Sequence, residues 1–336
     1  MNPGVAGGRP LRAAIVGAGL MGKWHAHAVA RCGHLVVAIV DSSVERASTL
    51  ARSHAGARAH TSLRDVNDAI DVVHVCAPPS SHHALVTEAL ASGAHVIAEK
   101  PLAMSAADTN ELLTRAERAG RLLVPVHQFL FQRGVLEAAA WLPSIGPLLH
   151  FDAVACTAGA AGRSADERDR VAVEVLPHAL SLMIRLVSPE MARVEWHVRR
   201  ARAGELRIDG VLLDTAVSAL VSTGGRPTTN VLRLIGENGT VHVDLFHGFA
   251  VRARGKATRR SKVTQPFLSG ASLFAGAASN LVRRAVTREP AYPGLRELVR
   301  RFYDAVEHGT SAPIAPDETL AVATAIDRIA GAIPRS

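Results

Sequence analysis

Residues 11–22 read LRAAIVGAGLMG, an apolar run that leads directly into glycines in GxGxxG spacing. The run predicts a buried strand, and the residues after it predict a helix that opens at the glycines. Glycines allow a tight turn and a close backbone approach, and unpaired N–H groups at a helix start favour a pyrophosphate. A glycine-rich turn without a ligand is the alternative. We expect a dinucleotide to contact the backbone of Gly17, Gly19, Leu20, Met21 and Gly22.

An acidic residue ends the next predicted strand. Asp41 lies 19 residues after Gly22, where a carboxylate can accept hydrogen bonds from an adenosine ribose. Its charge would repel a 2′-phosphate, and Ser42 and Ser43 stand where an arginine could have bound that phosphate. The expected cofactor is therefore NAD, with NADP less favoured; nearby Arg46 makes this preference a moderate one.

The order of the predicted strands and helices changes near residue 125. Before that point, strand-like runs such as DVVHVCAP (71–78) alternate with helical stretches, which implies a parallel sheet with helices on both faces. Beyond it, turn signals such as GENGT (236–240) join extended segments and favour antiparallel neighbours. The predicted parts are a flexible N-terminal tail (1–10), a dinucleotide-binding α/β Rossmann domain (11–125), and an α+β domain for substrate binding and oligomerisation with an open, mostly antiparallel sheet (126–336).

Composition restricts the class of partner. The chain has 336 residues and a net charge of +8, but only 4% of its residues are aromatic. A base-stacking platform is therefore not expected, and we expect no nucleic acid. The dense basic run RARGKATRRSK (252–262) is either a solvated loop or an anion-attracting surface. No stretch approaches the ~20 apolar residues of a membrane span, so we expect no membrane partner.

Cysteine and histidine positions favour a reduced, metal-free protein. Cys32, Cys76 and Cys156 lie far apart without CxxC spacing, which predicts free thiols and a cytoplasmic location. The first residues contain Gly and Pro where a signal peptide needs a long apolar run. The histidines between residues 25 and 83 show no ligand spacing, so we expect no metal.

One lysine stands out in HVIAEKPLA (95–103). Only four of the 38 basic residues are lysines, and Lys100 follows an apolar run and precedes Pro101. Arginine is permanently protonated, whereas burial can shift a lysine amine into acid–base work. Lys100 is therefore a candidate catalyst. The alternative is a lysine at a strand end that reaches water.

Three segments carry a resemblance to a known family: GAGLMGKWHA, CAPPSSHHALVTEALASGAHVIAEKPLA and LRLIGENGTVHVDLF. They resemble the glucose–fructose oxidoreductase and inositol dehydrogenase family (Gfo/Idh/MocA), closely over residues 11 to about 127 and loosely beyond. The resemblance implies a Rossmann domain and a second domain whose open sheet flanks the substrate pocket and mediates assembly, here into a homodimer or homotetramer. It also implies hydride transfer between NAD or NADP and a small sugar, cyclitol or related compound.

The resemblance also implies roles for single residues. In EKP, Lys100 would reach the reacting oxygen beside the nicotinamide, and Glu99 would contact the ribose side of the cofactor. A cation at that oxygen stabilises alkoxide charge and can relay a proton. Pro101 is compatible with a cis peptide bond, which the resemblance also suggests. The other cofactor positions implied are Ala77, Pro78 and His82; for His82, a structural hydrogen bond at a helix start is an equal alternative.

The second domain departs from the family pattern. Members that dehydrogenate commonly have an aspartate four residues before a histidine and another three after it. VAVEVLPHALSLMIRLV supplies His178, with Glu174 and Ser181 at the acidic positions. A histidine here can act as a general base that a carboxylate orients. Pro177 fits best in a first helical turn, which would place Glu174 ahead of that helix; His178 would otherwise be a capping or core histidine.

A further departure lies in LLVPVHQFLFQRG (122–134). Relatives often have an asparagine and an arginine here, whereas this chain has Gln128 and Leu130. His127 and Gln128 are candidates to line the nicotinamide pocket, with His127 and Glu174 also candidate substrate contacts. The missing arginine removes an anchor for a highly polar substrate, which disfavours inositol itself.

These observations favour an NAD(P)-dependent oxidoreductase that acts on a sugar-like or cyclitol-like alcohol or ketone. Lys100 or His178 would exchange the hydroxyl proton while a hydride passes to or from the nicotinamide. Two alternatives stay open: an NAD-dependent glycoside-cleaving enzyme on the same scaffold, and a non-catalytic dinucleotide-sensing protein. The presence of both Glu99 and Lys100 argues against the second.

Overall fold

The computed structural model describes residues 9–190, 194–254, 259–289 and 291–333. Two compact units emerge: one holds residues up to Val126 together with Leu295–Leu320, and the other holds His127–Gly294 and the chain from Ala321 onward. Of the predicted N-terminal tail, residues 1–8 lie outside the described residues.

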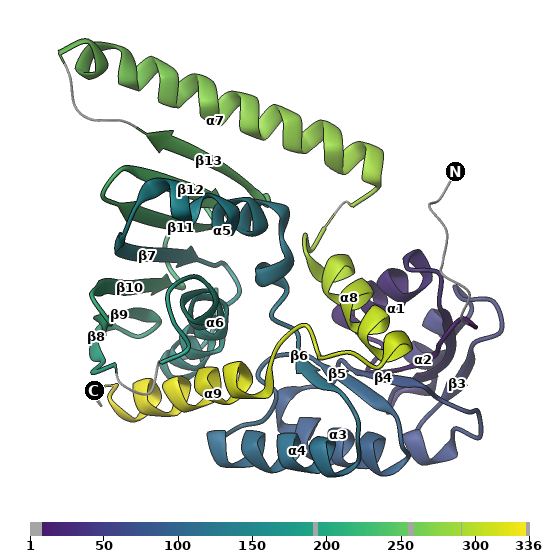
Figure 1. The fold of residues 1–336 in the computed structure, drawn as a ribbon. Helices are drawn as coiled ribbons and strands as arrows, with labels where there is room; N and C mark the ends of the chain where they lie inside the picture. The colour runs from purple at the N-terminus through teal and green to yellow at the C-terminus, as the bar shows by residue number, and fades with distance from the viewer. Residues whose placement is uncertain (1–8, 191–193, 255–258, 290, 334–336) are drawn as a thin grey trace. The chain divides into compact units, whose positions relative to one another are not determined.

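The first unit is built on a six-stranded parallel sheet in the order β3-β2-β1-β4-β5-β6 (Figure 1). Its strands are β1 (Arg12–Val16), β2 (Leu35–Val40), β3 (Arg58–His60), β4 (Val72–Val75), β5 (His95–Ala98) and β6 (Leu123–Pro125). The helices that connect them are α1 (Leu20–Arg31), α2 (Val44–Ala51), α3 (His82–Ala91) and α4 (Ala106–Arg118). The strand order reverses between β1 and β4, and ligands of such sheets bind at the carboxyl ends of the strands beside this switch point. The predicted Rossmann architecture is confirmed.

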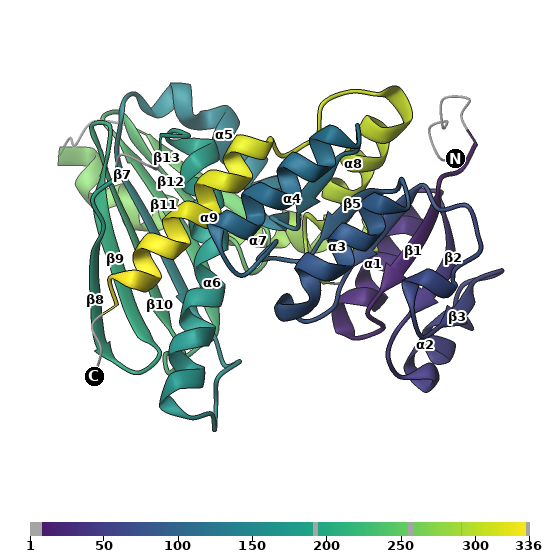
Figure 2. The same ribbon diagram turned by 90° about the horizontal axis from the view of Figure 1, so that it is seen from below.

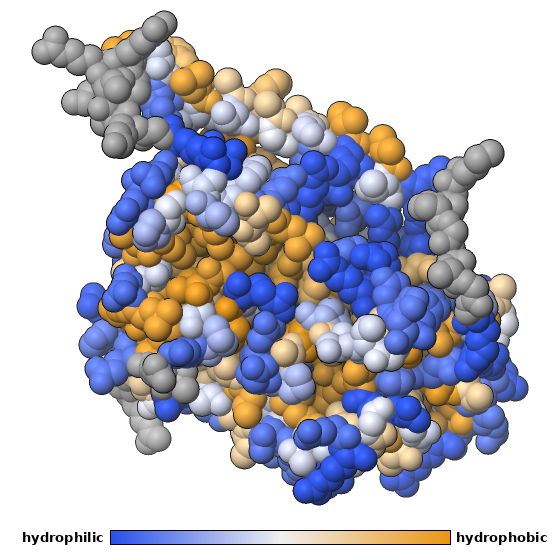
Figure 3. Space-filling model, in the orientation of Figure 1, coloured by the Kyte–Doolittle hydropathy of each residue, from blue (hydrophilic) through white to orange (hydrophobic). Residues whose placement is uncertain are grey.

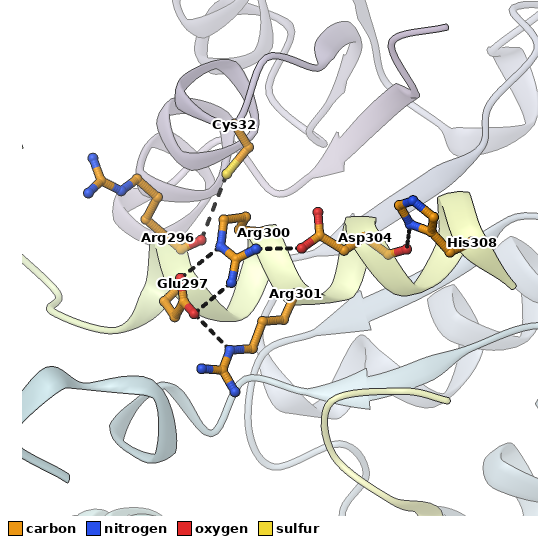
Figure 4. Close-up of polar contacts among 7 residues, drawn as sticks. All are labelled: Cys32, Arg296, Glu297, Arg300, Arg301, Asp304 and His308. Atoms are coloured by element: carbon orange, nitrogen blue, oxygen red, sulfur yellow. Dashed lines mark hydrogen bonds and ion pairs between the residues drawn. The ribbon is translucent and has the colours of Figure 1, made fainter. Parts of the chain in front are cut away.

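Helix α8 (Leu295–His308) returns from the C-terminal part of the chain to pack on α1 of the first unit. Its apolar side buries Phe302 and Tyr303 completely. The polar side forms pairs one turn apart, with Glu297 accepting from Arg300 and Arg301 (Figure 4). The predicted second domain included these residues, but the packing of α8 groups them with the first unit.

The second unit holds a seven-stranded sheet in the order β13-β12-β11-β7-β10-β9-β8. All neighbours are antiparallel except β7 and β10. The strands are β7 (Leu148–Cys156), β8 (His197–Arg202), β9 (Glu205–Leu212), β10 (Thr215–Ser222), β11 (Thr229–Gly236), β12 (Gly239–Asp244) and β13 (Phe249–Arg254). The mostly antiparallel sheet expected here is confirmed.

Helices cover one face of this sheet. They are α5 (Arg133–Ile145), on β11–β13, and α6 (Ala165–Leu186), on β7, β9 and β10. Side chains alternate along the strands, so that Phe151 is buried while His150 is exposed. Figure 2 shows α5 and α6 on the same side of this sheet, whereas α7 packs against the edge strand β13. The remaining helices are α7 (Arg259–Thr287) and α9 (Pro316–Gly331).

Helix α6 corrects one expectation about Pro177. The helix begins with a capping box in which the Ser164 hydroxyl accepts from the Glu167 N–H and the Glu167 carboxylate accepts from the Ser164 N–H. Because this cap satisfies the start of the helix far upstream, Pro177 lies inside the helix and not in its first turn. Glu174 is therefore one turn before His178 on the same helix.

No helix among the described residues is long and apolar enough to cross a membrane.

Candidate active site

The glycine loop between β1 and α1 has the shape that a dinucleotide requires. Gly17 has a φ of +102°, and a Cβ there would lie 2.5 Å from the Cys76 carbonyl oxygen. A Cβ on Gly22 would lie 1.8 Å from the Gly17 carbonyl oxygen. By contrast, a Cβ on Gly19 would meet nothing within 4 Å, and no described side chain caps α1. The loop therefore leaves the first N–H groups of α1 open to a phosphate, which fits NAD or NADP.

Asp41 joins the end of β2 to this loop. Its Oδ2 accepts from the Ala18 N–H at 2.8 Å, and its Oδ1 accepts from the Ser43 N–H at 2.9 Å and from Arg46 Nη2 at 2.6 Å. Burial opposes ionisation, but the hydrogen bonds from Arg46, Ser43 and Ala18 outweigh it and hold the pKa of the Asp41 carboxyl below its usual value. The carboxylate is thus charged, fixed in place and paired with a guanidinium.

The EKP segment follows β5 at the carboxyl edge of the sheet. The Lys100 N–H donates to the Glu99 carboxylate at 3.3 Å, and the Lys100–Pro101 peptide bond is cis. β5 pairs with β4, whose end leads to Ala77 and Pro78. The segment therefore lies at the edge where a ligand of this fold binds.

His82 links the same two loops. Its Nδ1 lies 2.7 Å from the Pro101 carbonyl oxygen and its Nε2 lies 2.8 Å from the Ala77 carbonyl oxygen. The ring is fully buried, so both ring nitrogens are used in protein contacts. This geometry favours the structural role for His82 over a direct contact with the cofactor.

A chain of buried polar groups extends inward from Glu99. Glu99 Oε1 lies 3.2 Å from His25 Nε2, His25 Nδ1 lies 2.8 Å from His74 Nδ1, and His74 Nε2 lies 2.8 Å from the Tyr303 hydroxyl. His25, His74 and Tyr303 are fully buried. These residues come from α1, β4 and α8, so three elements distant in sequence converge behind Glu99.

The positions of the protons in this series of hydrogen-bonded groups follow from Glu99, the acceptor at its end. An ionised carboxylate can only accept, so His25 Nε2–H donates to Glu99. With neutral rings, His25 Nδ1 then accepts from His74 Nδ1–H, and His74 Nε2 accepts from the Tyr303 hydroxyl. We name this series, Tyr303 to His74 to His25 to Glu99, the buried relay.

The pKa shifts of His74, Tyr303 and Glu99 agree with this order of donors and acceptors. Burial lowers the pKa of His74 well below its ordinary value and raises that of the Tyr303 hydroxyl well above it. Burial also raises the pKa of Glu99, but the hydrogen bond from His25 and the charge of Lys100 outweigh this effect, and the pKa lies below its usual value. Glu99 therefore stays ionised beside Lys100. His74 was the only local signal for the relay in the sequence, as a polar residue within a buried strand.

The predicted substrate residues of the second unit gather around α6. The His178 ring stacks on Phe129, with centroids 4.3 Å apart and an interplanar angle of 26°. The Ser181 hydroxyl donates to the His178 carbonyl oxygen at 3.1 Å, so Ser181 is bonded to the helix backbone. His127 and Gln128, which precede Phe129, are buried in the same unit.

Leu130 is buried, with 3% of its surface exposed. At this position, where relatives often have an arginine, the chain therefore places a core residue. The short 3₁₀ helix Gln128–Phe131 is held by Gln132, whose Nε2 donates to the Leu245 carbonyl oxygen at 2.9 Å.

One group of described residues has potential metal ligands close together. Ligand atoms of His83, Asp108 and Glu111 lie within 4.8 Å of one another. Arg115 donates to Glu111 Oε1 at 2.7 and 2.9 Å, and His83 lies 3.4 Å from Oε2. Ion pairs thus engage Glu111 and His83, and the expectation of no metal stays a prediction.

Comparison with known proteins supports the family. A model of an oxidoreductase family with an NAD-binding Rossmann fold (GFO_IDH_MocA) matches residues 11–127. Inositol 2-dehydrogenase 1 of Saccharopolyspora erythraea is 30% identical over 267 residues, 73% of this chain and 77% of that protein. A scyllo-inositol 2-dehydrogenase (NADP⁺) of Bacillus subtilis is 28% identical over 123 residues, 36% and 38% of the two chains.

Solved structures show the same fold over nearly the whole chain. The WlbA dehydrogenase of Bordetella pertussis, in complex with NADH and UDP-GlcNAcA, superposes with a TM-score of 0.75 at 19% identity, covering 96% of both chains. The first curated sequence matches span only 32–36% of those relatives' lengths, but the Saccharopolyspora enzyme matches over most of its length. The chain therefore belongs to the Gfo/Idh/MocA family of oxidoreductases, as its motifs indicated.

Proposed function

We propose that this protein is an NAD-dependent dehydrogenase or ketoreductase that interconverts an alcohol and a ketone on a sugar-like or cyclitol-like molecule. The observation that carries the proposal is the placement of Glu99 and Lys100 at the carboxyl edge of the sheet, beside the glycine loop. A dinucleotide-sensing protein would need the loop and Asp41, but not a lysine at that edge.

Cofactor binding would use residues of the first unit. The N–H groups over Gly17–Gly22 would hold the pyrophosphate, Asp41 the adenosine ribose, and Ala77, Pro78 and Glu99 the opposite side. The bound nicotinamide supplies or accepts the hydride. NAD is favoured because a 2′-phosphate would meet the Asp41 carboxylate, which two backbone N–H groups hold in place. Arg46 reduces this repulsion, so the preference is modest.

Proton exchange would use Lys100 first. Its ammonium would stabilise the developing alkoxide of the substrate and could release a proton, while Glu99 balances its charge. His178, with Glu174 one turn before it on α6, is the second candidate for proton exchange, and His127 and Gln128 are further candidate contacts. Leu130 offers no charged anchor, which supports a substrate less polar than inositol.

A panel of substrates tests this proposal. The purified protein is mixed with NAD⁺ or NADH and with sugars, cyclitols and nucleotide sugars, and absorbance at the NADH band is followed. We expect substrate-dependent formation or loss of NADH. Cleavage of a glycoside without net NADH would support the glycoside-cleaving alternative, and NADH binding without turnover of any compound would support the sensing alternative.

Two further expectations from the sequence stay proposals. The open sheet face supports a homodimer or homotetramer, which light scattering can measure. Cys32, Cys76 and Cys156 are free thiols, which supports a cytoplasmic location.

A further inference from the structure

The contact between the two histidines of the buried relay fixes the tautomers of both rings. A neutral imidazole has one N–H donor and one acceptor nitrogen. His25 Nδ1 and His74 Nδ1 lie 2.8 Å apart, so one of them must donate and the other must accept. The choice made here determines what each ring presents to the group beyond it: Glu99 at one end of the relay and Tyr303 at the other.

In one arrangement every donor of the relay points toward Glu99. His74 Nδ1–H donates to His25, and His25 Nε2–H donates to Glu99 Oε1 across 3.2 Å. Glu99 Oε2 accepts from the Lys100 N–H at 3.3 Å. An ionised carboxylate has about four lone-pair positions. Glu99 is therefore held by two contacts and can still accept hydrogen bonds from the hydroxyl groups of a ribose.

One proton added at the contact between Glu99 and His25 reverses this arrangement. If Glu99 carries it, the carboxyl donates to His25 Nε2, and the ring keeps its own proton on Nδ1. If His25 carries it, both of its ring nitrogens are protonated. In either case His25 Nδ1–H must donate to His74 Nδ1. Neutral His74 then carries its proton on Nε2 and donates to the Tyr303 hydroxyl oxygen, 2.8 Å away.

The hydroxyl proton of Tyr303 favours the first arrangement. Tyr303 is fully buried, and among the described residues His74 is the one hydrogen-bond partner of its hydroxyl. In Figure 3 the outward side of α8 is largely hydrophilic, whereas Tyr303 lies on the buried side of this helix. When His74 donates to the hydroxyl, the proton of Tyr303 loses its acceptor. A buried donor without an acceptor disfavours the reversed arrangement about tenfold or more.

The titratable neighbours of the relay do not replace this acceptor. At Glu99, the charge of Lys100 favours the carboxylate. Burial, with a smaller contribution from the Glu99 charge, raises the pKa of the Cys76 thiol well above its ordinary value, so this thiol stays neutral. The titratable groups that face Tyr303 from other elements are His34, Cys32 and Asp71. None of these three accepts a hydrogen bond from the hydroxyl.

We propose that Tyr303 and His74 are positioning residues that act through the tautomer of His25. They keep the Glu99 carboxylate ionised and fixed, so that it can accept hydrogen bonds from the ribose of the nicotinamide. This inference rests on the proposed function for the role of Glu99, but it does not depend on the substrate. It gives α8 a part in the chemistry at the end of β5.

NMR spectra of histidine nitrogens test the arrangement in the full-length protein without cofactor or substrate. The histidines carry a nitrogen label, and protonated and unprotonated ring nitrogens are distinguished by their chemical shifts. The variants His25→Leu and His74→Phe identify the signals of the two rings. At about pH 7.5 we expect the proton of His74 on Nδ1 and that of His25 on Nε2. A proton on Nε2 of His74, or on Nδ1 of His25, would overturn the proposal.

The affinity for NADH tests the consequence for Glu99. Tyr303→Phe removes the hydroxyl proton that opposes proton uptake at Glu99 and His25. Fluorescence titration should therefore show wild-type affinity near pH 8, and a loss of about threefold or more relative to the wild type near pH 5.5. Circular dichroism at each pH verifies that the variant is folded. NADPH replaces NADH if it binds more tightly.

Thr109→Val is the matched control, since it also removes a buried hydroxyl from the first unit. The Thr109 hydroxyl donates to the Ser105 carbonyl oxygen at 2.8 Å, outside the relay. This variant should keep the pH dependence of the wild type. If folded Tyr303→Phe also keeps it, Tyr303 has a structural role only and the proposal fails.

These results are separable from those of the proposed function. Reversed tautomers would overturn this inference alone, because hydride transfer with Lys100 does not require Tyr303. The expected tautomers and pH dependence, in a protein that turns over no compound, would support the positioning role and contradict the proposed dehydrogenase activity.

Discussion

Lys100 is the residue on which the proposed chemistry depends. If its ammonium stabilises charge mainly in the transition state, Lys100→Met should lower kcat by roughly two to three orders of magnitude, as for loss of a preorganised donor. Lys100→Arg should also fail, because a guanidinium cannot release a proton and has a different shape. Steady-state kinetics measure kcat, and fluorescence titration should show little change in NADH affinity. Near-normal turnover of Lys100→Met would refute the catalytic role.

Substitutions of Asp41 and of Arg46 should shift the preference for NADH over NADPH in opposite directions. Asp41→Ala removes a ribose acceptor and a repulsive charge, so it should narrow the preference for NADH over NADPH. Arg46→Ala removes the guanidinium that compensates this charge at 2.6 Å, so it should widen the preference. Calorimetric titration of both cofactors measures each ratio. A wild-type protein that favours NADPH, or two variants that shift the ratio in the same direction, would contradict this assignment.

The buried relay is a property of elements, since it joins α1, β4, β5 and α8. Tyr303→Phe removes the donor to His74 and leaves a buried acceptor without its partner, which should cost about 1–3 kcal/mol of unfolding free energy. Urea unfolding measures this loss. In a double-mutant cycle with His25→Leu, a residue that the Tyr303 hydroxyl does not touch, we expect non-additivity of more than about 0.5 kcal/mol. Additive effects would show that the two residues do not share a network.

Sequence patterns predicted those features that depend on residues next to one another in the chain. The glycine loop, Asp41 at the end of β2 and EKP after β5 each depend on neighbouring residues, and each lies where the pattern placed it. Pro177 was placed wrongly, because the cap that starts α6 at Ser164 lies thirteen residues before it. The relay was not predictable, because His74 meets a tyrosine 229 residues further along the chain. Because of the same long-range packing, α8 belongs to the first unit, although the sequence analysis had placed its residues in the second domain.

Over the whole molecule, histidines that are buried or half-buried should make the free energy of unfolding depend on pH. Burial lowers the pKa of His34, His74, His95 and His242 in the folded protein. Below their ordinary value of about 6.5, these histidines bind protons more readily in the unfolded chain, so the unfolded state gains stability as the pH falls. We therefore expect full stability above about pH 7 and a progressive loss between about pH 6.5 and 5.

Urea midpoints at several pH values check this expectation. Each histidine that stays neutral in the folded state contributes up to about 1.4 kcal/mol per pH unit. His74→Phe should reduce the slope. A stability that is unchanged or higher at pH 5.5 would contradict the assignment of these histidines as neutral when folded.

The return of α8 also sets an order of events during synthesis. A ribosome adds about 5–20 residues per second, so the 229 residues between His74 and Tyr303 take roughly 10–45 s to translate. During that interval the nascent cofactor-binding unit lacks α8, and the ring of His74 has not yet met its hydroxyl partner. The unit that begins the chain is therefore completed only after all strands of the seven-stranded sheet have been translated.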